Sequence, residues 1–449
     1  MKSTREIVLP PSLKPGILGG HFITFRRNPT RFLTDLSALG DVTFFRMGSV
    51  PGYFVNHPDL VRDVLVVNAQ KFKKGRALQR SKRLLGEGLL TSEKEKHLRQ
   101  RRMIQPAFHR QRIAAYAETM VTYGEQMAQK WQDGEVRDID KEMMQLTLQI
   151  VGQTLFSADV EDEADGVGQA MTTVIELFNF LLLPFSEWLE KLPLPHSKRF
   201  NRARQTLNDV IYGIINERRA SGEDKGDLLS MLLLAQDEDD GTGMTDEEVR
   251  DEALTLFLAG HETTANALTF TWYLLSQNPE AESKLHEEID AVLNGKTPTI
   301  DDVPKLKYTE HVVAEAMRLY PPAWAIGRSA LEEHDLGGYT VPERGLVLLS
   351  PYITQRDPRF WPESDKFIPE RWDDQSVKEA GQKYIYFPFG GGVRRCIGES
   401  FAWTEAILLV ATLAQKWKLR LDPGQKIALN PMITLRPKYG MRMRIAARS

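Results

Sequence analysis

The chain has 449 residues, 42% of them hydrophobic, so it is long enough to bury a sizeable core, and its composition excludes a disordered protein. Its 58 basic and 61 acidic residues give a net charge of -3, which excludes nucleic-acid binding through overall charge. The single cysteine, Cys396, excludes an internal disulfide and a cysteine-rich metal site. Taken alone, such a cysteine is most often a small buried hydrophobic residue.

The N-terminal stretch MKSTREIVLPPSLKPG is polar and interrupted by prolines. A membrane span needs roughly 20 consecutive apolar residues, and a signal peptide needs a continuous apolar stretch after its basic start. Neither pattern is present here. We therefore expect a cytoplasmic protein without a membrane span.

Helical periodicity dominates from about residue 95 to 320 and returns at about 397–417. We predict a mainly α fold with a smaller β region built from about 40–60, 325–350 and 420–449. Length alone fits two or three domains or one large helical domain, and composition does not separate these alternatives. The β-like runs are Val42–Phe45, Tyr53–Val55, Leu346–Leu349 and Met441–Ile445.

A long helix is predicted between Thr245 and Ser276. Thr245 followed three residues later by Glu248 is a capping box, and the apolar pattern that follows stops at Asn278-Pro279. A helix of about thirty residues greatly exceeds the usual three or four turns, so we expect it to cross the whole molecule.

The middle of this helix reads Ala259-Gly260-His261-Glu262-Thr263-Thr264. A mid-helix glycine costs roughly 1 kcal/mol relative to alanine, so its presence needs a reason. Glu262 and Thr263 lie either on a solvated face or beside a bound small molecule. Both alternatives stay open on local sequence alone.

Cys396 follows a run of glycines and two arginines in the stretch FPFGGGVRRCIG. Glycines let a backbone turn tightly around a bulky planar group. We predict that Cys396 opens an amphipathic helix from Ile397 to about Trp417, whose positive end favours a thiolate. A cysteine thiolate is one of the few protein ligands of haem iron.

Phe389, Gly392, Arg394, Cys396 and Gly398 match the pattern F-x-x-G-x-R-x-C-x-G, and the chain thereby resembles the cytochrome P-450 family. Other family landmarks follow in order from about Pro10 to the C-terminus. The resemblance implies one domain over 1–449, with a long central helix over haem and the cysteine loop on the opposite face. It also implies one haem b per chain, with Cys396 as the axial ligand of the iron.

Glu315 and Arg318 resemble the family's E-x-x-R helix pair, and Arg371 in FIPERW resembles the arginine that joins it. The resemblance implies a buried, structural triad behind the haem loop. Without it, an acid and a base three residues apart would be ordinary for an exposed helix, where the pair is worth about 0.2–0.5 kcal/mol.

Haem propionates need cationic or hydrogen-bonding partners, and arginine binds a carboxylate through two parallel hydrogen bonds. His97 and Arg101 resemble the family's W/H-x-x-x-R pattern, and Arg328 and Arg394 resemble two further propionate contacts. For His97, a solvated helix position is nearly as good an interpretation. Besides these, the expected haem contacts are Ala259, Phe389, Cys396 and Gly398.

Ala259 to Thr263 resembles the family's oxygen-activation motif A/G-G-x-E/D-T, with O2 as co-substrate. Thr263 is expected to hold a water or oxygen by its hydroxyl, and Glu262 to stand at the entry of the proton path. We predict hydroxylation of an apolar molecule. Alternatives are a peroxide-driven peroxygenase or isomerase and a non-catalytic haem sensor or carrier, none of which needs this acid–threonine pair.

The residues after Cys396 read as a final helix and strands, so the electrons are expected from a separate ferredoxin or flavodoxin with its NAD(P)H reductase. Arg99, Arg102, Arg110 and Arg112 form either a docking face for such an acidic partner or a solvated basic helix face. We expect a monomer.

The substrate-pocket positions of the family carry only apolar residues here, which favours a fatty acid, terpenoid or carotenoid. The segment Leu177–Leu194 resembles the family's entrance helices, which contact lipid surfaces transiently, and the phrases LYPPAW and SPYITQRD resemble a branch with carotenoid hydroxylases. Ordinary core packing is the alternative for each pocket position. These positions are Phe72, Leu84, Leu85, Ala323, Trp324, Ile326, Met432 and Ile433.

Overall fold

The computed structural model describes residues 8–16, 19–157, 194–237 and 241–448, together with the single residues 170, 173, 174, 177 and 192. The predicted entrance segment Leu177–Leu194 therefore lies almost wholly outside the described residues. The chain divides into two compact units, each described by itself: a β-rich unit (Met1–Gln79, Arg318–Lys366 and Arg371–Cys396) and a helical unit (Arg80–Met317, Phe367–Glu370 and Ile397–Ser449). The prediction of a single domain stays a prediction.

The β-rich unit is built on a sheet with the strand order β1-β2-β8-β5-β3, in which β2 and β8 run parallel and the other neighbours antiparallel. The strands predicted near residues 53–55 and 346–349 are neighbours in this sheet, because Tyr53 of β2 pairs with Val347 of β8. Apolar side chains from these strands share one buried cluster that includes Val42, Phe44, Tyr53 and Phe387. The strands of this unit are β1 (Val42–Met47), β2 (Val50–Val55), β3 (Phe72–Lys74), β5 (Ile326–Ala330), β6 (His334–Leu336), β7 (Tyr339–Val341) and β8 (Leu346–Leu349).

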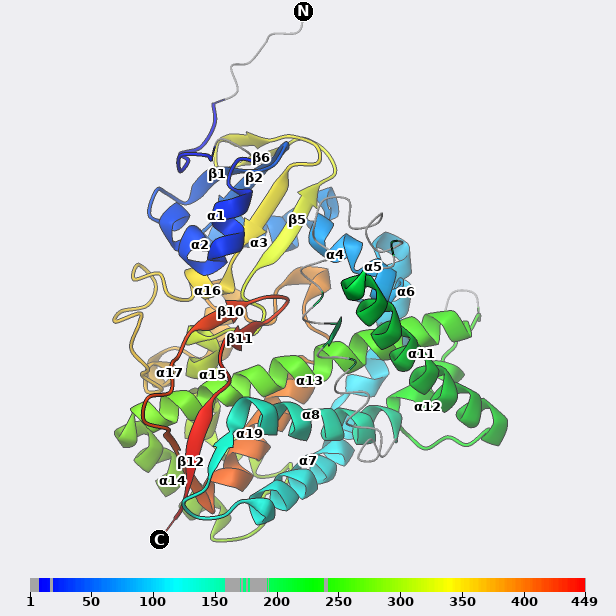
Figure 1. Cartoon of the computed structure of the whole chain (residues 1–449), viewed down its shortest axis with the longest axis vertical. Helices are drawn as coiled ribbons and strands as arrows, with labels where there is room; N and C mark the ends of the chain where they lie inside the picture. Colours follow the sequence, from blue (N-terminus) through cyan, green and yellow to red (C-terminus); the bar gives the residue numbers. More distant parts are fainter. Residues whose placement is uncertain are drawn as a thin grey trace, which may run out of the picture. The chain divides into compact units, whose positions relative to one another are not determined.

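The β-rich unit also contains short helices, of which α1 and α2 lie beside this sheet (Figure 1). They are α1 (Phe22–Arg27), α2 (Pro29–Ser37), α3 (Pro58–Arg62), α16 (Pro351–Thr354), α17 (Arg371–Asp374) and α18 (Val377–Gln382), with a π-helical turn at Asp63–Val67 and 3-10 turns at Ala69–Lys71 and Gly392–Arg394. Helices α4 (Arg76–Arg80) and α15 (Lys307–Leu319) contain residues of both units.

The helical unit carries most of the long helices, and the chain is mainly α as predicted. Its helices are α5 (Lys82–Leu85), α6 (Lys94–Ile104), α7 (Arg110–Lys130), α8 (Ile139–Phe156), α11 (Pro195–Ser221), α12 (Leu228–Leu234), α13 (Asp246–Gln277), α14 (Pro279–Leu293) and α19 (Glu399–Ala414), with 3-10 turns at Gln105–Phe108 and Val303–Lys305. Among the described helices, none is long and apolar enough to cross a membrane.

Small sheets complete the helical unit. The predicted C-terminal run forms β12, which pairs with β4 and β9 rather than with the sheet of the β-rich unit. A separate hairpin joins β10 and β11. The strands are β4 (Val136–Asp138), β9 (Trp417–Leu421), β10 (Leu429–Pro431), β11 (Leu435–Pro437) and β12 (Arg442–Ala447).

Helix α13 has 32 residues and runs through the helical unit with α8 and α19 packed beside it (Figure 1). The predicted capping box is confirmed, because the Thr245 hydroxyl accepts from the backbone N–H of Glu248 and the Glu248 carboxylate accepts from that of Thr245. The helix ends before Pro279, as predicted. Most of its side chains are buried on every face, which is typical of a helix inside a core.

Helix α19 differs from the amphipathic helix predicted between Ile397 and Trp417. It begins at Glu399, and its side chains are buried on all faces from Thr404 to Ala414. Trp417 starts strand β9 instead, where it pairs with Ala447 of β12. The amphipathic prediction was wrong because α19 packs against both α7 and α13, so no face remains for solvent.

Glu405 lies in this fully buried part of α19, and burial raises the pKa of its carboxyl group to about 8, against an opposing effect of the Thr264 side chain. Its ordinary pKa is 4.5. Between these two pH values the folded protein keeps a proton that the unfolded chain releases. The unfolding free energy should therefore fall as pH rises through this window, by about 1.4 kcal/mol per pH unit.

Glu405→Gln should remove this dependence, because the amide resembles the protonated acid. The melting temperature of the variant minus that of the wild type should increase steadily from pH 5 to pH 8, followed by circular dichroism. Glu280→Gln, at the exposed start of α14, is the control and should give a constant difference. A constant difference for Glu405→Gln as well would contradict a buried, protonated carboxyl group.

Candidate active site

The loop that carries Cys396 closes on itself through backbone hydrogen bonds. The N–H of Cys396 donates to the carbonyl of Phe389 at 2.9 Å, and the N–H of Gly390 donates to the carbonyl of Phe387 at 2.9 Å. The Cys396 side chain is exposed. The alternative of a small buried hydrophobic residue is therefore wrong, and the loop presents a thiol on a fixed backbone, with the cationic residues Arg394 and Arg395 next to it in the chain.

Glycines are required in this loop because the loop backbone packs directly against neighbouring atoms and leaves no space for a side chain. Gly392 has a φ of +63°, and a Cβ atom there would lie 2.0 Å from the backbone oxygen of Leu65. A Cβ atom on Gly391 would lie 2.5 Å from the ring of Tyr384. A larger residue at either position would push the loop away from the π-helical turn Asp63–Val67 or from Tyr384.

Arg318 is completely buried behind this loop in the β-rich unit. Its guanidinium donates to the carbonyls of Gln355 at 2.7 Å, Ser364 at 2.8 Å and Lys366 at 3.0 Å. The Gln355 side chain then donates to the Arg318 carbonyl at 3.1 Å and accepts from the N–H of Phe387 at 2.9 Å. Gln355 thus connects the buried arginine to the first residue of the cysteine loop, a link that no sequence pattern indicated.

The other two residues of the predicted triad also lie at buried or half-buried positions. Arg371 is positioned over the ring of Trp361 at 5.9 Å, and Arg318 over the same ring at 5.3 Å. Glu315 belongs to the helical unit, is completely buried and accepts from the N–H of Ile368 at 3.0 Å. The exposed-helix alternative for Glu315 and Arg318 is therefore wrong, while their action as a triad stays a prediction.

In the helical unit, α13 has an open stretch in its middle. Ala259 is exposed and Leu258, Gly260 and Thr263 are half-buried, whereas residues 249–257 and 264–272 are all buried. The Thr263 hydroxyl donates to the Ala259 carbonyl at 2.7 Å. Gly260 has a different role, because a Cβ atom there would lie 3.1 Å from Val151 of α8, so the missing side chain lets α8 approach.

Glu262 faces away from the open stretch and is almost completely buried. Its carboxylate accepts from the Thr434 hydroxyl at 2.6 Å and lies 3.8 Å from Nε of Arg436, both near the β10–β11 hairpin. The Asn266 side chain donates to the Glu262 carbonyl at 2.8 Å and to the Thr434 hydroxyl at 3.2 Å. Burial raises the pKa of Glu262, and Arg436 and then Thr434 oppose that shift. The solvated-face alternative for Glu262 is wrong.

Two more titratable groups lie close to this cluster. Burial raises the pKa of Asp140 on α8 to about 6, against the opposing charge of Arg436. Burial lowers the pKa of His261 to about 4, so His261 is neutral at pH 7. Glu262 therefore lies in a buried polar cluster around Arg436, and sequence reasoning missed Thr434, Arg436 and Asp140 because they are distant in the chain.

The predicted propionate contacts are divided between the units. Arg328, which donates to the Gly327 carbonyl at 3.2 Å, and Arg394 belong to the β-rich unit. His97 and Arg101 lie one turn apart on α6, and the His97 side chain is 2% exposed. The solvated alternative for His97 is wrong. Phe389 is half-buried in the cysteine loop, and Gly398 is the N-cap of α19.

The predicted substrate-pocket residues also divide between the units, and their role stays a prediction. Phe72, Ala323, Trp324 and Ile326 belong to the β-rich unit, where Trp324 stacks on Phe25 with ring centres 6.5 Å apart. The positions in the helical unit are Leu84, Leu85, Met432 and Ile433.

Most of the four predicted docking arginines are held by acceptors of the helical unit itself. Arg99 lies 3.5 Å from carboxylate oxygens of both Asp237 and Glu248. Arg112 donates to the Gly226 carbonyl at 2.9 Å. The basic face is therefore solvated only in part: the side chains of Arg102 and Arg110 are exposed, and Arg102 also pairs with Asp237.

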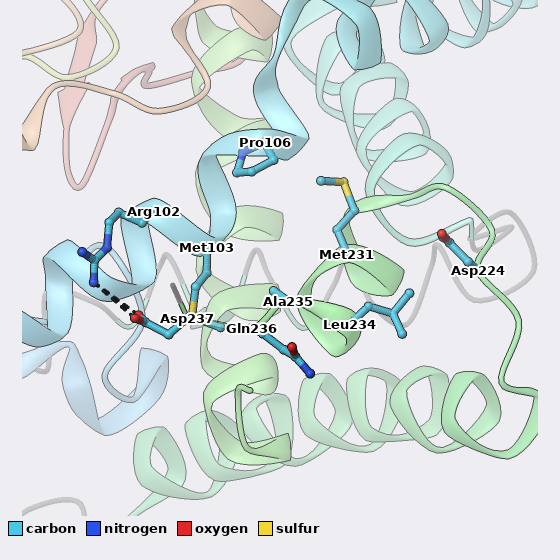
Figure 2. Close-up of a pocket in the computed structure, with 9 residues that line it drawn as sticks. All are labelled: Arg102, Met103, Pro106, Asp224, Met231, Leu234, Ala235, Gln236 and Asp237. Atoms are coloured by element: carbon cyan, nitrogen blue, oxygen red, sulfur yellow. Dashed lines mark hydrogen bonds and ion pairs between the residues drawn. The ribbon is translucent and has the colours of Figure 1, made fainter. Parts of the chain in front are cut away.

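Arg102 also marks the rim of a surface pocket of about 310 Å³, where it lies 3.4 Å from Asp237 (Figure 2). Met103 of α6 and Met231 of α12 extend toward the space between these helices in the same view. None of the predicted haem or oxygen-site residues lines this pocket. Its lining residues are Arg102, Met103, Pro106, Asp224, Met231, Leu234, Ala235, Gln236 and Asp237.

Comparison with known proteins gives a consistent assignment. Residues 10–442 match the family model described as Cytochrome P450. The chain is 42% identical to cyclooctatin synthase of Streptomyces melanosporofaciens, over 96% of this chain and 94% of that protein. It is 39% identical to cyclooctat-9-en-7-ol 5-monooxygenase of the same organism (90% and 88% covered). It is 38% identical to pentalenene oxygenase of Streptomyces avermitilis (96% and 95% covered).

Arg318→Lys should destabilise the protein although it keeps the positive charge. A lysine ammonium cannot replace the planar fork that reaches three separate carbonyls, so buried acceptors lose their donors at a cost of at least about 3 kcal/mol. Unfolding in urea, followed by circular dichroism, measures this loss. Arg344→Lys, whose side chain is 74% exposed, is the matched control in the same unit. Equal stability of both variants would show that the Arg318 fork is dispensable.

Proposed function

This chain belongs to the cytochrome P450 family and is a monooxygenase, and on that premise we propose that it hydroxylates a terpenoid, inserting one oxygen atom of O2 into a C–H bond. The observation that carries the substrate class is the similarity to three relatives, two of which are named for acting on cyclooctat-9-en-7-ol and pentalenene. The predicted pocket residues are all apolar, which supports the same class over a small polar compound. Among the predicted substrates, a fatty acid and a carotenoid are less well supported.

The residues present fit the haem that the family binds. Cys396 offers an exposed thiol on a rigid glycine-dependent loop, and α13 is open in its middle, at Ala259 and Thr263. Cys396 would hold the iron as a thiolate, while His97, Arg101, Arg328 and Arg394 would hold the two propionates. When bound, haem b supplies the O2 binding and the oxidising power that C–H hydroxylation needs.

The protein's own contribution to the reaction is proton supply and orientation. Thr263 lies in the open stretch, where its hydroxyl donates to the Ala259 carbonyl and its oxygen can accept a hydrogen bond from the group that delivers a proton. Glu262, the next residue, holds a proton more readily than a solvated acid because burial raises its pKa. Its Oε1 atom bonds to the Thr434 hydroxyl, so this acid is kept in one position between turnovers.

Electrons come from a separate ferredoxin or flavodoxin reduced by its NAD(P)H reductase. Arg110 is the cation that such an acidic partner would meet first, since Arg99, Arg102 and Arg112 are engaged within the chain. A cytoplasmic, monomeric protein remains our expectation.

Cys396→Ser should abolish the red-shifted Soret band that thiolate-bound haem gives with carbon monoxide in the reduced state, because a serine hydroxyl is not a thiolate donor. Oxidation of pentalenene, supplied with a generic ferredoxin and reductase, should stop as well. Mass spectrometry of the product and a spin-state titration with pentalenene test the wild type. A variant that keeps the band would contradict ligation by Cys396. Product formed equally well with peroxide alone would instead favour a peroxygenase.

Thr263→Ala should uncouple cofactor consumption from hydroxylation, because the open stretch loses its hydroxyl while the thiol loop is untouched. NAD(P)H oxidation should continue, product should fall and hydrogen peroxide should rise. A loss of about 1.4 kcal/mol in the productive barrier shifts this branching roughly tenfold. Thr264→Val, which removes a hydroxyl that is buried within the helix, is the control. Equal coupling in both variants would leave Thr263 with a packing role only.

A further inference from the structure

Three consecutive charged residues near the start of α13 are buried, which is unusual for a helix. Arg250, Asp251 and Glu252 are 9%, 6% and 0% exposed. Successive residues point about 100° apart around a helix, so these side chains face three directions. Each of these groups must therefore find a partner, because a buried charge without one is costly.

Backbone N–H groups of one distant segment, residues 84–89, donate to both carboxylates, while the other Asp251 oxygen accepts from Nη1 of Arg250 at 2.7 Å. The N–H of Glu87 donates to Asp251 at 2.7 Å, and the N–H of Leu89 donates to Glu252 at 2.8 Å. Arg250 completes the junction, because it donates to the Leu84 carbonyl at 3.2 Å.

Helix α11 supports this junction at two places, at Arg250 of α13 and at Arg83, the residue just before the segment. Arg250 donates through Nε to the Asn208 side chain at 2.9 Å, and Arg204 donates to the Arg83 carbonyl at 3.3 Å. Both Asn208 and Arg204 lie on α11. Residues 84–89, which follow from α5 (Figure 1), are thus bonded to α13 at three backbone atoms, and α11 is bonded to the carbonyl of the residue before them.

The fit between this segment and α13 leaves no room for side chains at the glycines. A Cβ atom on Gly86 would lie 2.0 Å from Oδ2 of Asp251, and one on Gly88 would lie 2.5 Å from Oγ1 of Thr255. Gly86 also has a φ of +59°. The segment therefore lies directly on the helix backbone at this place.

The face of α13 that residues 84–89 cover is the same face that becomes exposed nearer the middle of the helix, at Ala259. Glu252, Thr255, Ala259 and Thr263 follow each other at spacings of three, four and four residues, so they share one stripe of the helix. The segment covers Glu252 and Thr255, which are buried, and the stripe becomes exposed at Ala259. The edge of residues 84–89 is therefore a wall at one end of the open stretch.

We propose that Asp251 and Glu252 are positioning residues that clamp residues 84–89 onto α13 and thereby fix one wall of the substrate pocket. The pocket role rests on the proposed function, because Thr263 in the open stretch is assigned to oxygen chemistry there. The clamp itself rests on the hydrogen bonds alone. Selectivity for the shape of the substrate follows from a wall that is held at its backbone and cannot adapt.

Glu252 is the residue to change, because burial raises the pKa of its carboxyl group to about 8 and the neutral amide of glutamine can replace it. Glu252→Leu keeps the volume but removes the acceptor for Leu89, and it also removes a buried acid, so folding should survive. Glu252→Gln keeps an acceptor oxygen and should restore wild-type behaviour. Glu247→Leu and Glu247→Gln are matched controls one turn nearer the helix start, at an exposed position.

Two measurements on the haem-loaded, full-length protein test the proposal. The first is hydrogen–deuterium exchange of the peptide that spans residues 84–92, which reads the clamp without any turnover. The second is the ratio of the dissociation constants of imidazole and 4-phenylimidazole, followed by the haem spectrum, since only the phenyl group needs the pocket wall. We expect Glu252→Leu to speed hydrogen–deuterium exchange of this peptide about tenfold. We also expect it to lower the dissociation constant of imidazole divided by that of 4-phenylimidazole about tenfold. The other three variants should match the wild type in both measurements.

Unchanged exchange in Glu252→Leu would overturn the clamp. Faster exchange with an unchanged azole ratio would overturn the pocket wall and leave Glu252 with a purely structural role. A wild-type protein that binds neither azole would overturn the proposed function together with the pocket wall, and the exchange result would then show separately whether the clamp exists.

Discussion

Burial of the Arg318 guanidinium constrains the β-rich unit, because an arginine inside a protein must find acceptors for all of its donors. Backbone carbonyls of Gln355, Ser364 and Lys366 are among them, so these stretches of irregular chain are held around a single group. Gln355 carries the constraint on to the N–H of Phe387. The loop that ends in Cys396 therefore starts from a fixed point, and the bond from the Cys396 N–H to the Phe389 carbonyl fixes its other end.

The helical unit uses buried charge in the opposite sense, with carboxylates on a helix and donors on the segments around it. Glu252 binds the backbone of residues 84–89, and Glu262 binds the side chain of Thr434. Replacing such acids by apolar residues is often neutral or stabilising, so their presence argues for a gain in position rather than in stability. Each acid holds one particular segment in one register on the helix through directional hydrogen bonds. An apolar surface would not distinguish between registers in this way.

Sequence reasoning was most successful where the cause of the structure is local. The capping box at Thr245 and the stop before Pro279 gave the bounds of α13 almost to the residue, and the fixed pattern around Cys396 indicated a tight glycine loop. It failed where the cause is tertiary. Helix α19 looked amphipathic because its local pattern does not reveal that two helices cover it. Gln355 and Thr434 carry no recognisable motif, and only folding brings them to Phe387 and Glu262.

Helix α13 carries two acids with different proposed roles, Glu252 and Glu262, at separate places along one rigid helix. Glu252 and Glu262 are ten residues apart, about 15 Å along the helix axis, and the open stretch at Ala259 begins between them. Groups this far apart without shared partners contribute almost independently. Substitutions in residues 84–89 are therefore expected to leave the bond between Glu262 and Thr434 intact. A helix that is buried nearly everywhere supplies this separation, because neither segment can move without breaking a hydrogen bond in the core.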